Sequence, residues 1–319
     1  MSRVLATLLL LTAAAATAPA AADQSIPDQY PGSVLYQKPV EVIPNVWSAI
    51  GATAPPTYEN AGHNNNLSFI VTGDGVVVVN GGASYRLAEA LHAEIQRITD
   101  QPVVLVVNEN GQGHAMLGNS YWAEQGVPIL AHEDAAAEFE EKGYDSLDRH
   151  RRILKERAEG TEVVGPTETF ADRHVIERGG TTIEVLHLGP AHSPGDISVW
   201  LPEEKLVIAG DMAFHERMLP IFEETDTAGW LETWEGPFEG LGAIYVIPGH
   251  GHPTNMAQVR RYTRDYLADL RAKVRAHIDA GGDLAEAYYV DQSAWSHLDT
   301  FEELATRNAG RVFEAMEWE

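Results

Sequence analysis

Three short segments in the second half of the chain each place a candidate metal ligand beside glycine. His192 stands in GPAHSPGD, Asp211 in AGDM and His250 in IPGHG. Imidazole and carboxylate groups bind metals such as zinc, and glycine lets the backbone turn sharply and leaves space near an ion. Three such side chains on three similar segments predict a metal site, and a purely structural role for all three is the less favoured interpretation.

A segment in the first half, NENGQGHAMLGN at 108–119, looks like a metal-binding loop whose ligands have mostly been exchanged for amides. It carries Asn110 and Gln112, whose neutral oxygens are weak zinc ligands beside imidazole, and it carries His114. Glu109 in the same segment is a candidate acid or base, and solvent exposure is an equal expectation for it. Function depends on whether this segment and the three later ones form one site.

Strands must position these segments, and the apolar pattern predicts them. In the first half we expect strands at 42–50, 67–71, 76–79, 103–107 and 127–131, with helices at 85–98 and 119–125. In the second half we expect strands at 174–176, 182–188, 197–201, 205–208 and 243–247. The three glycine-containing segments then each follow the end of a strand. The alternation of strand and helix favours an α/β fold with layered sheets.

Helical segments complete the pattern. The charged, helical pattern at 134–158 indicates a surface insertion with a break near Gly143. We interpret the basic run at 148–152 as a solvated helix face rather than a substrate clamp. A helix beginning near Asn255 has one buried stripe with helical spacing: Val259, Tyr262, Tyr266, Leu270, Val274 and His277. Gly281-Gly282 end this helix, and a last helix is predicted at 300–316. No flexible linker divides the chain.

Composition restricts the partners and the location. The formal net charge is −25 and the chain has no cysteine, so we expect a surface that repels nucleic acid and anionic lipid, and a metal site without thiolate. Residues 1–22 combine Arg3, a short apolar run and an Ala-x-Ala end, which is typical of a secretory signal peptide cleaved near Ala22. We therefore expect a soluble protein, periplasmic or secreted, without a membrane anchor, that acts on a small-molecule substrate.

The motifs GPAHSPGD, IAGDMAF and IPGHG, in this order and spacing, resemble those of the metallo-β-lactamase superfamily. The resemblance covers roughly 42–253, and it is greatest with the exported branch associated with periplasmic sulfur-oxidation and quinoprotein systems. It implies an α/β fold, namely a four-layer αββα sandwich with C-terminal helices. The domain plan that follows is a signal peptide at 1–22, a metallo-β-lactamase-like domain at 23–258, and a helical extension at 259–319 packed on the same domain.

The resemblance also implies which residues bind metal. The family binds two zinc ions, and its first motif is His-x-His-x-Asp-His. Alignment on the Gly-Asn at 118–119 places Asn110 and Gln112 at the two leading histidines, His114 at the aspartate and Ala115 at the last histidine. Asn80 stands where the family usually has aspartate. On this alignment the first zinc site loses both leading histidines.

The second zinc site retains more of its ligands. It keeps Asp211 and His250, and His114 replaces the missing carboxylate, which gives two histidines and one carboxylate with an open position for water. We therefore expect one zinc ion, and ferrous iron would suit the same set. His192 is expected either as a fourth ligand or as a group that assists proton transfer. Asn110 and Gln112 are expected to line the pocket rather than bind the ion.

Two further histidines are candidates for the pocket. His63 lies in the polar cluster 61–66, where it could replace a lost ligand, and a polar turn is the alternative. His215 follows Asp211 by four residues and could reach the pocket. The alternative for each is a structural role.

The predicted function is that of an exported metal-dependent hydrolase. Metal-bound hydroxide would attack an amide, ester, lactone or thioester carbonyl, with Asp211 and His192 as the catalytic residues. The altered first motif argues against ordinary two-zinc β-lactam hydrolysis. The alternatives are a non-catalytic member of the fold that binds a ligand or partner protein, and iron-dependent redox chemistry at the same residues.

Overall fold

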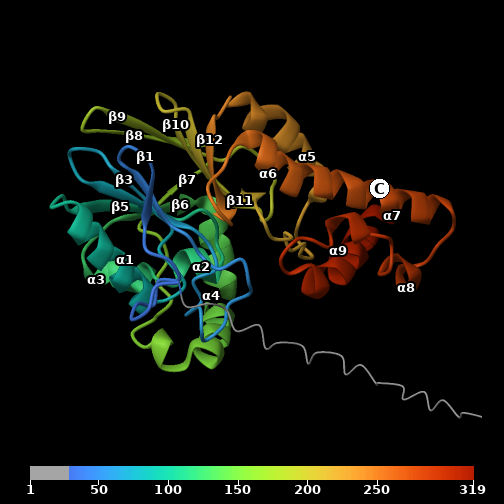
Figure 1. The fold of residues 1–319 in the computed structure, drawn as a ribbon, viewed down its shortest axis with the longest axis horizontal. Helices are drawn as coiled ribbons and strands as arrows, with labels where there is room; N and C mark the ends of the chain where they lie inside the picture. The colour runs from blue at the N-terminus through green and yellow to red at the C-terminus, as the bar shows by residue number, and fades with distance from the viewer. Residues whose placement is uncertain (1–28) are drawn as a thin grey trace, which may run out of the picture.

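The computed structural model describes residues 29–319, whose strands form two sheets (Figure 1). The first sheet has seven strands in sequence order: β1 (Val40–Ile43), β2 (Val46–Ala49), β3 (Leu67–Val71), β4 (Val76–Val79), β5 (Val103–Val107), β6 (Ile129–His132) and β7 (Glu168–Phe170). The second has five, in the order β12 (Tyr245–His250), β11 (Leu206–Phe214), β10 (Ser198–Leu201), β9 (Thr181–Leu186) and β8 (Arg173–Arg178). Strands β4 to β7 are parallel, as are β11 and β12.

The two sheets pack face to face because their strands alternate buried side chains between two cores. In β4, Val77 and Val79 join a core between the sheets that also contains Val199 and Ile247 of the second sheet. Val76 and Val78 belong instead to the core beneath the first helices. Because every residue of β4 is buried, this strand lies inside the molecule on both faces.

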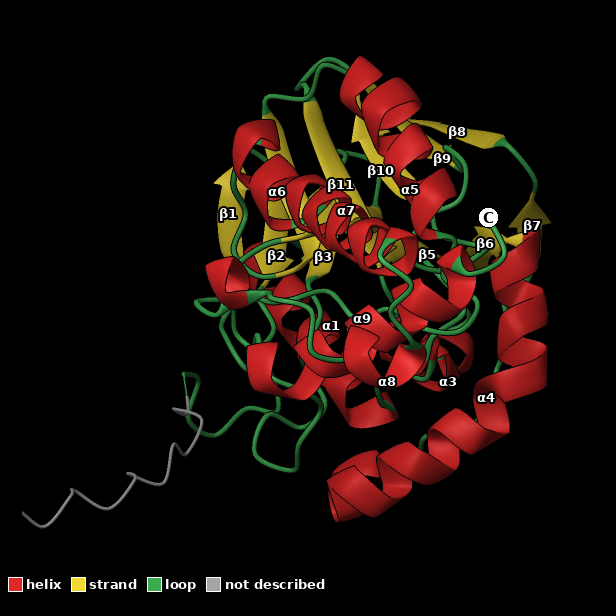
Figure 2. Cartoon of the chain, turned by 90° about the vertical axis from the view of Figure 1, so that its right-hand side faces the viewer, coloured by secondary structure: helices red, strands yellow, loops and turns green. Residues whose placement is uncertain are grey.

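Helices cover both outer faces. On the first sheet, α1 (Tyr85–Ile98) and α3 (Asn119–Glu124) contribute to one core. On the second sheet, α5 (Thr227–Thr233), α6 (Met256–Tyr262) and α7 (Arg264–Asp279) pack with α8 (Leu284–Ala287) and α9 (Phe301–Met316). Figure 2 shows α6 and α7 in front of β11. The predicted αββα layers with C-terminal helices are confirmed.

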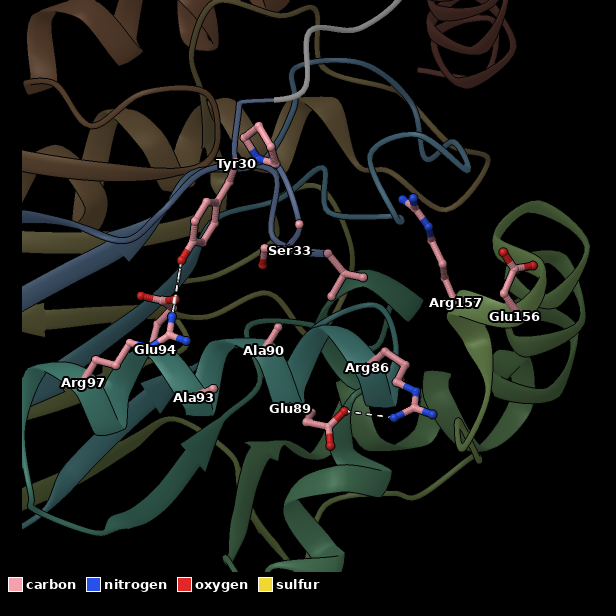
Figure 3. Close-up of a pocket in the computed structure, with 13 residues that line it drawn as sticks. Tyr30, Ser33, Arg86, Glu89, Ala90, Ala93, Glu94, Arg97, Glu156 and Arg157 are labelled. Atoms are coloured by element: carbon pink, nitrogen blue, oxygen red, sulfur yellow. Dashed lines mark hydrogen bonds and ion pairs between the residues drawn. The ribbon is translucent and has the colours of Figure 1, made fainter.

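The segment before β1 is fixed to the outer face of α1. Tyr30 donates a hydrogen bond from its hydroxyl to Glu94 Oε1 at 2.6 Å, and Arg97 pairs with the same buried carboxylate (Figure 3). The cavity in this view lies between this segment and α1, on the far side of the first sheet from the second. The predicted signal peptide at 1–22 lies outside the described residues. Among residues 29–319, no helix is long and apolar enough to cross a membrane.

Several predicted boundaries were wrong for identifiable reasons. The strand predicted at 42–50 is two strands, because Asn45 adopts φ 69° and turns the chain between β1 and β2. The helix α4 (Glu133–Leu154) runs through Gly143 without a break, and a short 3₁₀ turn (Lys155–Ala158) follows. The helix predicted from Asn255 divides at Thr263 into α6 and α7.

Two strands of the second sheet, β11 and β12, extend past their predicted C-terminal ends and include a candidate ligand each. Strand β11 continues past Ile208 to Phe214, so Asp211 lies within an irregular strand rather than on a loop after it. His250 is likewise the last residue of β12. Their positions are therefore fixed by parallel pairing between β11 and β12.

The C-terminal helix α9 is attached through a buried asparagine. Asn308 donates to the Leu219 carbonyl at 2.7 Å and to the Tyr266 hydroxyl at 3.0 Å, and its Oδ1 accepts from the Ile221 amide at 2.9 Å. Asn308 is fully buried. Replacing it would leave buried backbone groups without partners, which costs more than the hydrogen bonds themselves contribute.

We predict that Asn308→Ala lowers the free energy of unfolding by about 2–4 kcal/mol, because two buried backbone groups lose their partners. Urea denaturation measures this change. Glu314→Gln, at a half-exposed position of the same helix, is the control and should change stability by less than about 0.5 kcal/mol. A loss for Asn308→Ala as small as that of the control would show that α9 is not anchored through this residue.

Candidate metal centre

His114, Asp211 and His250 come together at one end of the two sheets. His114 lies in the single turn α2 (Gly113–Met116) after β5, and the other two lie in β11 and β12. One ligand atom from each falls within 4.8 Å of the others, and all three residues are buried. The sequence-predicted ligand set therefore converges, although its three members come from both sheets.

The ligand atoms have the separations that a metal imposes. His250 Nε2 lies 3.2 Å from Asp211 Oδ1, and His114 Nε2 lies 3.6 Å from Asp211 Oδ2. Zinc bonds of about 2.0–2.1 Å in a tetrahedral arrangement place neighbouring ligand atoms roughly 3.3 Å apart. Glycine at 249 is required here, because a Cβ at that position would clash with Asp211 Oδ1.

The hydrogen-bond pattern of His250 leaves its metal-facing nitrogen bare. His250 Nδ1 lies 2.5 Å from the Asn64 carbonyl oxygen and donates to it, so the neutral ring has no hydrogen on Nε2. Asp211 Oδ1 is buried, and no hydrogen-bond partner reaches it from residues 29–319. Two electron-rich atoms thus face each other at 3.2 Å, and a cation between them would satisfy both. The residues present fit a divalent metal ion.

Electrostatics at the centre favour an ionised Asp211. Burial opposes ionisation, but His250 and His114 hold the pKa of Asp211 well below its usual range. Burial would also lower the pKa of His114, yet the Asp211 carboxylate and Glu109 raise it above its ordinary value.

Two amides of the loop at 108–119, those of Asn110 and Gln112, form hydrogen bonds where the aligned family motif has metal ligands. Asn110 donates through Nδ2 to Asp211 Oδ2 at 3.2 Å and to Asp196 Oδ1 at 3.1 Å. Gln112 Nε2 lies 3.1 Å from His192 Nδ1 and donates to it. These N–H groups supply the positive partners that Asp211 and His192 would otherwise find in a first ion. Gln112 lines the cavity as predicted, whereas Asn110 is buried behind it.

His192 lies beside the centre but outside the converging set. Its Nδ1 is 3.6 Å from Asp211 Oδ2, and this nitrogen accepts from Gln112. Burial lowers the pKa of His192 to about 4, so the ring is neutral near pH 7. Its Nε2 is buried without a hydrogen-bond partner beside Phe222 and Trp230. In this geometry His192 Nδ1 accepts from Gln112 and does not donate to the neighbouring carboxylate, and His192 lies outside the set of three converging ligands.

Sequence analysis underestimated two carboxylates next to the centre. Glu109 is buried rather than exposed, and its Oε1 lies 3.1 Å from His114 Nε2. Burial and the nearby Asp211 charge raise the pKa of Glu109, and the same two causes raise that of Asp196 well above its usual value. Asp196 closes the GPAHSPGD motif, and its distance of four residues from His192 was the available signal for it.

His63 and His215 are not pocket residues, contrary to prediction. His63 is fully buried, its Nδ1 accepts from the Tyr36 amide at 2.8 Å, and its Nε2 lies 3.3 Å from the Ala49 carbonyl. His215 Nδ1 bonds to the His252 carbonyl at 2.9 Å, away from the cavity. Both rings bond to backbone groups. His63 follows the turn made by Ala61 and Gly62, which have positive φ, whereas His215 directly follows β11.

The centre opens into a cavity of about 660 Å³ whose walls come from three parts of the chain. Helix α4 contributes Glu138, Lys142, Ser146, Arg149, His150 and Ile153. The insertion is therefore a wall of the cavity rather than a separate surface feature, and the basic run predicted to be a solvated face supplies Arg149 and His150. Helix α9 and the loop after β11 form the opposite wall.

The role of the Asn110 and Gln112 amides in excluding a first metal ion can be tested directly. We predict that the double variant Asn110→His with Gln112→His binds about two equivalents of zinc, because imidazole restores strong ligands beside Asp211 and His192. Elemental analysis after dialysis measures the metal content, and the wild type is expected to retain about one equivalent. Equal metal content in the two proteins, with both folded, would show that the amides are not what excludes a first ion.

Comparisons with known proteins agree with this geometry. The family model described as "Metallo-beta-lactamase superfamily" matches residues 114–250. A metallo-beta-lactamase type 2 from Bacteroides fragilis is 28% identical over 116 residues, which are 35% of this chain and 46% of that protein. A linear primary-alkylsulfatase from Pseudomonas sp. (strain ATCC 19151) is 21% identical over 232 residues, 61% of this chain and 44% of that protein. The matches thus span less than half the length of either relative.

Solved structures show the same fold. A metallo-beta-lactamase from Pontibacter korlensis superposes with a TM-score of 0.58 at 20% identity, covering 72% of this chain and 98% of that one. The DIM-1 metallo-beta-lactamase exposed to ceftazidime gives 0.58 at 17% identity, covering 72% and 96%. The matched residues 114–250 begin and end on two of the three converging ligands. Residues 114–250 of this chain match the metallo-beta-lactamase superfamily, whose members are mostly hydrolases that bind metal ions, and the described residues have the fold of its solved structures.

Proposed function

We propose that this protein is an exported hydrolase that uses one divalent metal ion to cleave an amide, ester, lactone or thioester. The observation that carries the proposal is the contrast between two sets of residues around Asp211. On one side His250 presents a bare nitrogen to an unpartnered carboxylate oxygen. On the other side Asn110 already satisfies the second oxygen with a hydrogen bond. One position for a cation is left open, and the other is filled.

The Asn64 carbonyl fixes the ring of His250 through Nδ1, which leaves Nε2 for a metal ion. Glu109 contacts His114 at Nε2, the same nitrogen that faces Asp211, so Glu109 lies beside the position of the ion. A divalent ion bound there supplies a Lewis acid that polarises a carbonyl group and lowers the pKa of bound water to near neutral. Zinc suits the two imidazoles and one carboxylate, and ferrous iron is the alternative.

The chain's own groups would order the substrate and move protons around this centre. The nitrogen of Gln112 is engaged with His192. Its amide oxygen has no hydrogen-bond donor among residues 29–319, so the oxygen can accept a hydrogen bond from the substrate. Glu109 is the buried carboxylate nearest to His114, and its raised pKa suits a group that holds a proton before releasing it. His192 keeps its predicted catalytic role in this proposal as a neutral ring beside Asp211 that Gln112 holds in place.

The partners and the location are part of the proposal. Signal-peptide features at 1–22 support export to a periplasm or to the medium, and the net charge of −25 argues against nucleic acid as a partner. The volume of the cavity, about 660 Å³, suits a small-molecule substrate. A non-catalytic binding protein of the same fold is the alternative, and it is favoured if turnover does not depend on the metal ligands.

We predict that His114→Ala and His250→Ala each lower metal affinity by more than about 100-fold, because even residues that only support a ligand affect affinity by about 10- to 100-fold. Hydrolysis of a panel containing nitrocefin, a lactone and a thioester should fall to background in both variants. His215→Ala is the matched control, since His215 points away from the cavity. Turnover that is equal in wild type and His250→Ala would contradict the hydrolase proposal.

A further inference from the structure

Buried polar atoms without hydrogen-bond partners gather around the cavity into which the metal centre opens. Among residues 29–319, eight buried side-chain atoms have no such partner, and five of them belong to residues that line this cavity. These five are Asn64 Oδ1, Glu138 Oε2, His150 Nε2, His192 Nε2 and Asp211 Oδ1. A buried polar group without a partner costs free energy, so the cluster indicates a ligand that supplies partners.

The metal centre accounts for two of the five atoms. Asp211 Oδ1 faces His250 Nε2 at 3.2 Å, where a cation would lie between them. His192 Nε2 is packed against aromatic rings beside the centre. Of the three atoms that remain, Glu138 Oε2 and His150 Nε2 both belong to α4. The partners that these two atoms lack therefore have to come from something other than the metal ion.

The unpartnered nitrogen of His150 is a hydrogen-bond acceptor. His150 is 9% exposed, and its Nδ1 donates to the carbonyl oxygen of Ser146, one helical turn earlier, at 2.8 Å. Burial lowers the pKa of His150, so the ring is neutral near pH 7 and its single N–H is the one on Nδ1. Nε2 therefore carries a lone pair that needs a donor from the cavity.

The unpartnered oxygen of Glu138 is an acceptor beside a charge that is already paired. Lys142 Nζ lies 3.4 Å from the other oxygen, Oε1, and 2.6 Å from Glu224 Oε1. Lys142 thus offsets the charge of Glu138 and leaves Oε2 without a partner. A second cation next to Lys142 would be repelled by it. The partner that suits Glu138 Oε2 is therefore a neutral donor and not an ammonium group.

Both acceptors lie against the loop at 108–119, on either side of Gln112. A Cβ at Gly111 would lie 2.9 Å from Glu138 Oε2, and a Cβ at Gly113 would lie 2.9 Å from Cε1 of His150. Glycine at these two positions leaves space for the two groups of α4. Gln112 lines the cavity between them, and no donor from residues 29–319 reaches its amide oxygen. Three acceptors thus follow one wall of the cavity.

On the basis of the proposed hydrolase function, we propose that this acceptor wall, defined as Gln112, Glu138 and His150, binds hydroxyl groups of a polyhydroxylated ester or lactone substrate. Hydroxyl groups on successive carbons supply several neutral donors, which a single amide or ammonium group does not. Each O–H can donate to the wall and still accept a hydrogen bond itself. Gln112 also contacts His192 beside the metal centre, so the hydroxylated part of the substrate lies next to the bond that is cleaved.

Calorimetric titration of the zinc-loaded full-length protein with two neutral lactams tests the proposal. Glucono-1,5-lactam carries hydroxyl groups on its ring, and δ-valerolactam has the same ring without them. We expect gluconolactam to bind at least about 10-fold more tightly. Glu138→Gln and His150→Phe should each weaken gluconolactam binding about 5- to 10-fold, because each variant removes one acceptor. Both variants should leave δ-valerolactam binding and the zinc content unchanged.

Glu141→Gln is the matched control, because Glu141 is an exposed residue of α4 that does not line the cavity. Equal affinity of the wild type for the two lactams would show that buried water alone satisfies the acceptor wall, and the proposal would be wrong. Unchanged gluconolactam affinity in both α4 variants would overturn it equally. Should His150→Phe fail to fold, Glu138→Gln decides alone, since glutamine keeps the size of the side chain.

The outcome is separable from the hydrolase proposal. A preference for gluconolactam that depends on Glu138 and His150, in a protein that hydrolyses nothing, would refute only the hydrolase function. Metal-dependent hydrolysis of δ-valerolactone and glucono-1,5-lactone gives the complementary measurement, with each kcat/KM divided by the uncatalysed rate of that lactone. Equal values for the two lactones would refute only the recognition of hydroxyl groups.

Discussion

A carboxylate that is taken out of water must be surrounded by positive charge or hydrogen-bond donors, and Asp211 is the group around which this molecule meets that demand. It is 1% exposed. His250 of β12 and His114 of α2 approach its two oxygens, and Asn110 donates to one of them. Because these partners come from both sheets, the stacking of β5 against β11 and β12 is a condition for the site and not only a scaffold for it.

The same constraint explains why the loop at 108–119 holds amides. An N–H donor can satisfy a buried oxygen without bringing the charge of a second ion, and Asn110 and Gln112 do so for Asp211 and His192. Glu109 then supplies a carboxylate beside His114, where the aligned motif has lost one. Glycine at 210 leaves room for it, since a Cβ there would lie 2.7 Å from Glu109 Oε2. The loop at 108–119 therefore holds hydrogen-bonding amides in place of the ligands of one metal ion, and it remains packed.

Much of the fold and of the candidate site could be predicted from the sequence. The features that could not be predicted depend on tertiary packing and not on local sequence patterns. The boundaries of α1 and β5 agree with prediction because apolar periodicity and the Ser84 cap are local signals. The convergence of His114, Asp211 and His250 followed from motif order. The inward faces of α4 and α9 did not, because which side of a charged helix meets a cavity is decided by tertiary packing. Glu138 belongs to no motif, and only its place in the cavity wall distinguishes it from the other glutamates of α4.

One metal ion rather than two is the central claim of this account. A crystal structure of the protein purified with zinc, with anomalous scattering recorded on both sides of the zinc edge, tests it most directly. The account predicts a single peak bounded by His114, Asp211 and His250, with Asn110 and Gln112 still bonded to Asp211 and His192. A second peak of similar height between Gln112 and His192, or a peak that His114 does not contact, would contradict it.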